Sequence, residues 1–340
     1  MAYNYTFHRH LVRYINSGCL KRMDVLLSFF FPALPLFLNA SKVSNMLNRL
    51  KDVRERDKEN FQFQEIFIEP YQCQYPYIEA MRNFLVETLK DDLYGAYIHG
   101  SLAMDEKIAY SDVDALIIIK DEVFQNPRRL AETACKLNRA LKYFYKIDLL
   151  QHHGWFVLTE SDLRDYPQTY FPWEIFKYAQ SLLPEKGLKI KLSFDPEKQD
   201  YKTPFLDLVL GIRFQLENHG YPRNMYQLKG LLSRFMLLPT LYCQARDRKG
   251  VFKKFSFDAA RKDFSASDWA IMDEVSDIRL NWHFSLDPVR GYFMTRRSPL
   301  WNRFKRKVGP RIPPGLKRKL TTGFYQRIFD LIEQMEEKLR

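Results

Sequence analysis

The sequence predicts an α+β fold: a small mixed β-sheet between an N-terminal helical segment and a helical C-terminal domain. Two short apolar runs, at 94–100 and 113–119, have the length and composition of buried strands. Helical periodicity flanks them at 76–90 and 127–145, and it dominates after residue 161. Helices before, between and after a few strands are typical of a small sheet packed against helices.

The chain is expected to divide where this pattern changes. Residues 1–75 are predicted to be a helical segment, 76–160 the sheet domain and 161–340 the helical domain. Further strands are expected at 146–152 and 155–158 in the sheet domain. The helices of the last domain are expected at 174–183, 204–218, 224–246, 267–282 and 321–340. Ser265 is predicted to cap the fourth of them, because Asp268 follows three residues later.

Two aspartates begin the second apolar run. Side chains alternate faces along a strand, so Asp112 and Asp114 should point the same way, while Val113 faces the opposite side. Two carboxylates that share a direction repel each other, and a hard divalent cation such as Mg²⁺ or Mn²⁺ would hold them together. Gly100 and Ser101 end the preceding run and offer a triphosphate close backbone approach, free N–H groups and a hydroxyl donor.

An apolar strand, Gly100-Ser101, ten intervening residues and then Asp112-Val113-Asp114 on a second strand resemble the DNA polymerase β-like nucleotidyltransferase superfamily. Ser111 and Ala103 also match its pattern. Asp105, however, stands where many members have a glycine. The resemblance spans about 94–158.

The resemblance implies a nucleotidyltransferase core that moves a nucleoside monophosphate from an NTP, such as ATP, to an acceptor hydroxyl and releases pyrophosphate. Asp112 and Asp114 would be catalytic metal ligands, with Gly100 and Ser101 at the nucleotide. A third carboxylate is implied on a later strand, and Asp148 is the candidate for that catalytic and metal-binding role.

Several relatives also use a lysine and a serine of the helical domain to hold the triphosphate. Lys229 and Ser233 are four residues apart and would share a helix face, which makes them candidates. Lys253 and Lys254 are rivals. If 146–152 is a strand, His152 should lie near the metal end of the sheet and His153 should point away from it.

The net charge of +12 is concentrated in one segment, 289–320, which contains no Asp or Glu. Its basic residues are Arg290, Arg296, Arg297, Arg303, Lys305, Arg306, Lys307, Arg311, Lys317, Arg318 and Lys319. Prolines and glycines argue against one continuous helix there. The segment suits a polyanionic acceptor such as RNA, an anionic membrane surface, or a solvated face that promotes solubility. A small hydroxylated molecule or a protein hydroxyl stays open as the acceptor.

The four cysteines are scattered and form no metal-binding spacing, so a reduced cytoplasmic protein is expected. The apolar run at 25–38 is too short for a membrane span and contains two prolines, which leaves a buried helix or an interfacial membrane contact.

Two functions remain open at this point. One is a metal-dependent nucleotidyltransferase. The other is a non-catalytic module with the same fold, which binds nucleic acid or an anionic membrane through segment 289–320.

Overall fold

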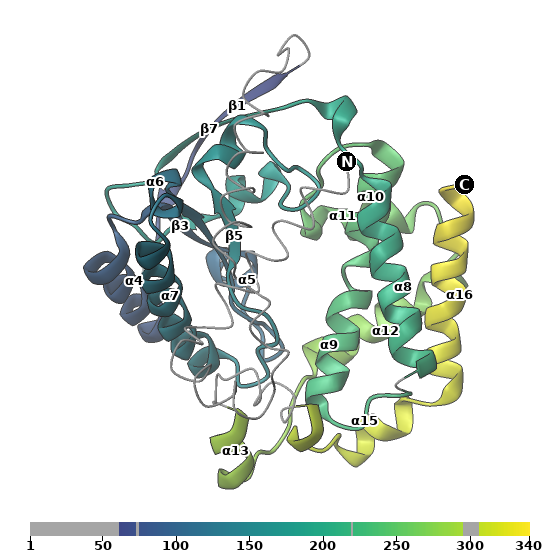
Figure 1. Ribbon diagram of the computed structural model, residues 1–340. Coiled ribbons are helices and arrows are strands. Elements are labelled where there is room, and N and C mark those ends of the chain that lie inside the picture. The colour runs from purple at the N-terminus through teal and green to yellow at the C-terminus, as the bar shows by residue number, and fades with distance from the viewer. Residues whose placement is uncertain (1–60, 73–74, 219, 295–305) are drawn as a thin grey trace, which may run out of the picture.

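The chain folds into a mixed sheet covered by helices, with a separate bundle of helices beside it (Figure 1). The computed structural model describes residues 61–72, 75–218, 220–294 and 306–340. The expected helices within 1–60, the apolar run at 25–38 and part of the basic segment therefore lie outside the described residues.

The strands of the sheet half run in an order that mixes directions. They are β1 (Gln62–Phe67), β2 (Glu69–Pro70), β3 (Leu93–His99), β4 (Asp114–Ile119), β5 (Phe156–Thr159), β6 (Gln180–Ser181) and β7 (Lys189–Phe194). The main sheet has the order β2-β6-β3-β4-β5, and β1 pairs with β7 in a two-stranded ribbon. β3 and β4 are antiparallel, whereas β4 and β5 are parallel. The α+β class and the mixed sheet are thus confirmed.

The helices cover the sheet and form the bundle. They are α4 (Pro76–Leu89), α5 (Gly100–Ala103), α6 (Asp121–Phe124), α7 (Pro127–Ile147), α8 (Lys202–Asn218), α9 (Met225–Phe235), α10 (Leu238–Asp247), α11 (Lys253–Arg261), α12 (Ala266–Leu280), α13 (Pro288–Met294), α15 (Pro314–Lys319) and α16 (Thr322–Lys338). The 3₁₀ turns within the described residues are η4 (Glu160–Arg164), η5 (Trp173–Tyr178) and η6 (Pro196–Lys198).

Four expectations about these elements were wrong. Residues 62–70 are strands rather than helix, and 174–183 is the turn η5 followed by the short strand β6. The segment at 146–152 is the end of α7 and a loop, not a strand. The predicted helix at 224–246 is divided into α9 and α10 just before Pro239. Ser265 caps α12 as predicted, because its side chain accepts from the Asp268 N–H.

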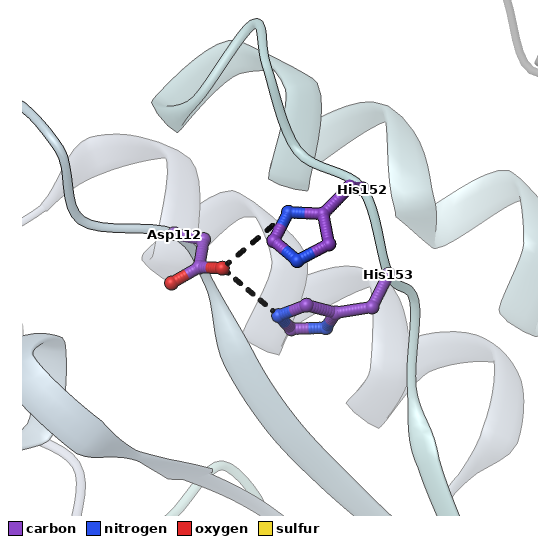
Figure 2. A group of neighbouring side chains, drawn as sticks. All are labelled: Asp112, His152 and His153. Atoms are coloured by element: carbon purple, nitrogen blue, oxygen red, sulfur yellow. Dashed lines mark hydrogen bonds and ion pairs between the residues drawn. The ribbon is translucent and has the colours of Figure 1, made fainter. Parts of the chain in front are cut away.

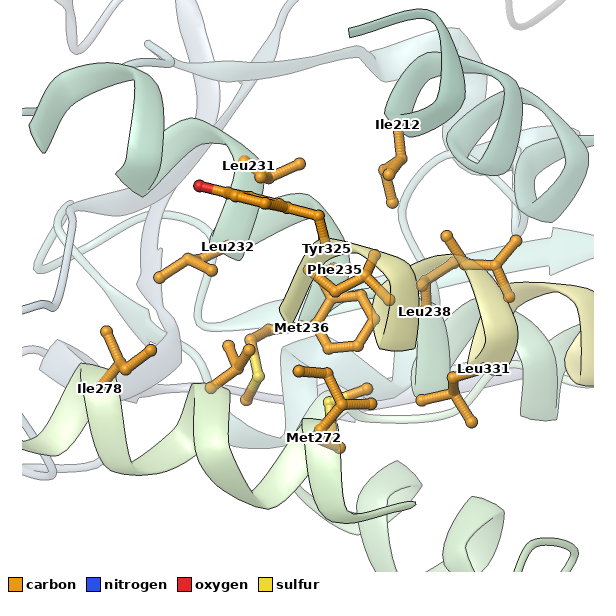
Figure 3. Close-up of a cluster of buried hydrophobic side chains, with 14 of the residues drawn as sticks. Ile212, Leu231, Leu232, Phe235, Met236, Leu238, Met272, Ile278, Tyr325 and Leu331 are labelled. Atoms are coloured by element: carbon orange, nitrogen blue, oxygen red, sulfur yellow. The ribbon is translucent and has the colours of Figure 1, made fainter. Parts of the chain in front are cut away.

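Three hydrophobic cores are found among the described residues, one on each face of the sheet and one in the bundle. α4 and α7 pack on one face of the sheet through a core that includes Met81, Ile117 and Phe144. The bundle encloses a second core around α9, α12 and α16, which includes Phe235 and Met272 (Figure 3). Tyr110 and Leu150, which belong to loops of the sheet half, are buried in this second core and so tie the two halves together.

Among the described residues, no helix is both long and apolar enough to cross a bilayer.

Candidate functional site

The two aspartates of the motif meet at one edge of the sheet. Asp114 begins β4, and Asp112 precedes it by two residues. Asp112 Oδ2 lies 3.1 Å and Asp114 Oδ1 lies 3.3 Å from the same atom, Nε2 of His153. The carboxylates therefore share a direction, as the strand alternation predicts.

Two neighbouring histidines approach Asp112 (Figure 2). His152 Nδ1 is 3.9 Å from Asp112 Oδ2, so His152 and His153 both approach that aspartate. The expectation that His153 points away was wrong because the residues before Phe156 form a loop, in which strand parity does not apply. Since β5 runs parallel to β4, this loop enters β5 at the edge where β4 begins.

A glutamine fastens the histidine loop to the aspartate strand. The Gln151 side chain accepts from the Val113 N–H at 2.9 Å and donates to the Val113 carbonyl at 3.0 Å. It also donates to the His153 carbonyl at 3.0 Å, and it is 1% exposed. This buried bridge holds both histidines opposite the motif, and nothing in the sequence pattern singled it out.

Gly100 is required at its position for two reasons. Its φ is +68°, which L-residues rarely adopt, and a Cβ there would lie 2.6 Å from Asp114 Oδ2. Asp105, which stands where the resembled superfamily often has glycine, also has a positive φ of 56°. The loop therefore bends at this point in the left-handed conformation that glycine favours.

Asp148 is not part of the group formed by Asp112, His152 and His153. It follows the last residue of α7 instead of lying on a strand, and its Oδ2 is 2.7 Å from the ammonium of Lys229. Its other oxygen accepts from the Leu150 N–H at 2.9 Å. The carboxylate is thus held by an ion pair within the protein and is not presented as a third ligand beside Asp112 and Asp114.

Lys229 and Ser233 are likewise engaged within the fold. The Lys229 side chain is 0% exposed and bonded to Asp148. The Ser233 hydroxyl lies 2.8 Å from the Tyr110 hydroxyl, which also donates to the Lys229 carbonyl at 2.9 Å. Both residues of α9 therefore join the bundle to loops of the sheet half.

Two other cations of the bundle, Lys253 and Arg279, lie near each other. Lys253, at the start of α11, feels the charges of Asp112 and Asp114, and neither its ammonium nor the guanidinium of Arg279 forms an ion pair among the described residues. Arg279 lies 4.8 Å over the Tyr110 ring, and its Nε is buried without a hydrogen-bond partner. The rival Lys254 is ion-paired with Glu106.

The electrostatics separate the groups further. Burial disfavours charge on both Asp112 and His153, but the hydrogen bond between them and their opposite charges outweigh this effect. The pKa of Asp112 therefore lies well below its usual range, and the pKa of His153 lies well above its own. Burial lowers the pKa of His152 to about 3, which leaves that imidazole neutral. Burial also raises the pKa of Asp148 despite the charge of Lys229.

The residues present do not fit the three-carboxylate metal set that the sequence resemblance implies. One ligand atom each from Asp112, His152 and His153 lies within 4.8 Å of the others, and Asp114 adjoins them through His153. The donors gathered at this edge are therefore two carboxylates and two imidazoles.

No protein-family model, curated protein or solved structure matches this chain. The functional argument therefore depends on the geometry of the site.

Proposed function

We propose that the protein is a metal-dependent nucleotidyltransferase that transfers a nucleoside monophosphate from an NTP to an acceptor hydroxyl. The observation that carries the proposal is the convergence of Asp112 and Asp114 beside Gly100. Only a glycine at this position leaves space for the Asp114 carboxylate. A binding module would gain little from holding two like charges in this position, whereas a phosphoryl-transfer site needs them to hold a cation.

Two cations without an ion-pair partner among the described residues support a polyphosphate ligand. Lys253 lies in the bundle, feels the charges of Asp112 and Asp114 from the other half of the molecule, and is close to Arg279. A buried arginine nitrogen without a partner is costly, and a phosphate oxygen would satisfy it with a charge-assisted hydrogen bond. We therefore assign the β- and γ-phosphates to Lys253 and Arg279, in place of Lys229 and Ser233.

The chain's own residues would perform the positioning. Gly100 and Ser101 let the backbone approach the phosphates closely, and Asp112 and Asp114 hold the cation against them. A bound divalent cation would neutralise phosphate charge and stabilise the oxygens of an in-line displacement. The pair of Asp148 and Lys229 has a positioning role, since it fixes α9 against the sheet half.

The acceptor is assigned to a polyanion such as RNA on the strength of the basic segment. In its described part, six basic side chains are exposed: Arg306, Lys307, Arg311, Lys317, Arg318 and Lys319. The segment is anchored to α9, because the side chains of Asn224 and Gln227 both donate to the Arg306 carbonyl at 2.7 Å. Its helices α13 and α15 are short, as the prolines predict.

Label transfer from each α-³²P NTP, with Mg²⁺ or Mn²⁺ and a cell extract, tests the proposal. Products are sorted into RNA, protein and small molecules. Asp112→Asn and Asp114→Asn should each lower transfer about a thousand-fold, which corresponds to about 4 kcal/mol of transition-state stabilisation. Asp207→Asn, an exposed aspartate of α8, is the matched control and should keep full activity. Full activity in either motif variant would refute the proposal.

A second function, the non-catalytic module, is favoured by one contact. His153 already balances Asp112 and Asp114, so these carboxylates have a counter-ion without any metal. Salt-sensitive RNA or vesicle binding, together with no metal-dependent stabilisation by any NTP, would favour this alternative.

A further inference from the structure

We infer that the site at the start of β4 prefers a divalent first-row transition ion to Mg²⁺, with His152 and His153 as nitrogen ligands beside Asp112. The inference extends the proposed function, and the role of the ion in nucleotide transfer rests on that function. The selectivity for the ion is a binding property, so it can be measured without any transfer. It arises from the disagreement between the donors found here and the three carboxylates that the sequence resemblance implies.

The geometry brings nitrogen and oxygen donors within reach of one ion. The ligand atoms of Asp112, His152 and His153 lie within 4.8 Å of one another, and a metal with bonds of about 2.1 Å would span donors up to about 4 Å apart. The distances from Asp112 Oδ2 to the two imidazoles, 3.1 Å and 3.9 Å, already meet that limit. Small rotations of the histidine side chains would complete the set.

The contacts of His153 with the protein fix its ring as in a metal-binding histidine. A metal-bound histidine usually uses its second ring nitrogen to contact a carbonyl or carboxylate, which fixes the ring. Nδ1 of His153 lies 3.1 Å from the Gly154 carbonyl, which leaves Nε2 directed at the aspartates. The buried side chain of Gln151 then ties this loop to the Val113 backbone between the two aspartates.

The chemistry of the donor atoms determines which ion the site prefers. Mg²⁺ takes oxygen ligands almost exclusively, whereas imidazole nitrogen binds first-row transition ions with affinity that rises from Mn²⁺ to Co²⁺. The carboxylate that would have made the site oxygen-rich, Asp148, is bonded to Lys229 at 2.7 Å. Two imidazoles, rather than a third carboxylate, thus lie beside Asp112.

Calorimetric titration of the full chain with Mg²⁺, Mn²⁺ and Co²⁺, without nucleotide, tests the selectivity. We expect affinity to increase in that order, with Co²⁺ bound at least about a hundred-fold more tightly than Mg²⁺. His152→Ala and His153→Ala should each weaken Mn²⁺ and Co²⁺ binding by about tenfold or more and change Mg²⁺ binding much less. His153→Asp should shift the preference back towards Mg²⁺. His283→Ala, an exposed histidine outside the site, is the control and should change nothing.

Pulsed EPR of bound Mn²⁺, with protein labelled with ¹⁵N-histidine, gives a direct readout of the ligands. Hyperfine coupling to two histidine nitrogens in the wild type, and to one in each alanine variant, would support the inference. Equal affinity for Mg²⁺ and Co²⁺, or absence of nitrogen coupling, would overturn it. If either substitution in a folded variant leaves Mn²⁺ binding unchanged, the proposed ligand set is wrong. A protein with the expected selectivity that transfers no nucleotide would retain this inference and lose the proposed function.

Discussion

Two acid–base pairs lie close together in this protein and differ in their access to water. Asp148 and Lys229 are 6% and 0% exposed and 2.7 Å apart. Asp112 and His153 are 19% and 27% exposed and 3.1 Å apart. A fully buried pair cannot exchange its partner for a ligand without leaving a charge uncompensated, whereas a partly exposed pair can open towards an incoming cation. A carboxylate paired with a basic side chain thus holds two parts of the fold together in one place and forms a candidate binding site in the other.

The largest expected effect breaks the buried pair. Lys229→Met should destabilise the fold by about 3–5 kcal/mol, because it leaves Asp148 buried without its counter-ion. Urea denaturation followed by fluorescence measures this. The double variant Lys229→Met/Asp148→Leu should recover most of the loss, since no isolated charge remains. Unchanged stability in the single variant would show that the pair does not hold α9 to the sheet half.

A pH titration of stability tests a further histidine, His99. His99 is 7% exposed, and burial lowers its pKa from 6.5 to about 4. Below pH 6.5 the unfolded chain binds a proton that the folded chain refuses, so stability should fall by about 3 kcal/mol as pH drops from 6.5 to 4, and this contribution should then level off. His99→Phe should remove that part of the pH dependence in denaturation experiments. His283→Ala should retain it, and an identical slope in all three proteins would contradict the assignment.

Gly100→Ala tests the space reserved for Asp114. The positive φ and the 2.6 Å approach to Asp114 Oδ2 together should cost about 2 kcal/mol of stability and displace the carboxylate from the candidate site. The matched control is Gly220→Ala, because Gly220 has the same φ of +68° with nothing within 4 Å of the added Cβ. Equal effects of the two changes on transfer and on melting temperature would mean that the clearance has no functional importance.

Replacing Lys253 or Arg279 should affect nucleotide affinity more than stability. Lys253→Met and Arg279→Met should each raise the Kd for an NTP about tenfold, equivalent to about 1.4 kcal/mol, and should affect the corresponding nucleoside monophosphate much less. Lys254→Met, next along the chain and paired with Glu106, is the control and should bind normally. Parallel losses for the triphosphate and the monophosphate would place these cations elsewhere on the ligand.

The smallest expected effect concerns Ser233. Ser233→Ala removes one of the two partners of the Tyr110 hydroxyl and should cost about 1 kcal/mol in stability, with nucleotide affinity unchanged within about twofold. Denaturation and nucleotide titration of the same variant check both parts. A large loss of nucleotide affinity would restore Ser233 to the phosphate site that spacing alone had suggested.

The local sequence pattern was sufficient to predict most of the helices and strands and the two aspartates of the candidate site. Residues 94–99 and 114–119 were recognisable as strands because their apolar runs are short and uninterrupted. The shared direction of Asp112 and Asp114 followed from the two-residue period of a strand. Charge content alone located the basic segment, and its prolines indicated that it is not one helix.

Other features depended on contacts between distant residues. Asp148 was assigned to a strand because its apolar neighbours resemble one, but α7 continues to Ile147 and the following loop carries Asp148 to Lys229, 81 positions later. Once 148–155 was a loop, the direction of His153 followed from Gln151 and Gly154 and not from parity.

The sequence by itself determined the α+β class, the position of the Gly100-Ser101 turn and the paired direction of two carboxylates, because each of these depends on neighbours within a few residues. Only the tertiary structure decided which charges meet: Asp148 with Lys229 and Asp112 with His153, whereas Lys253 and Arg279 have no counter-ion within the described part of the chain. Long-range pairing follows from how the sheet half and the bundle bury their apolar faces against each other, and a local pattern carries no information on that packing.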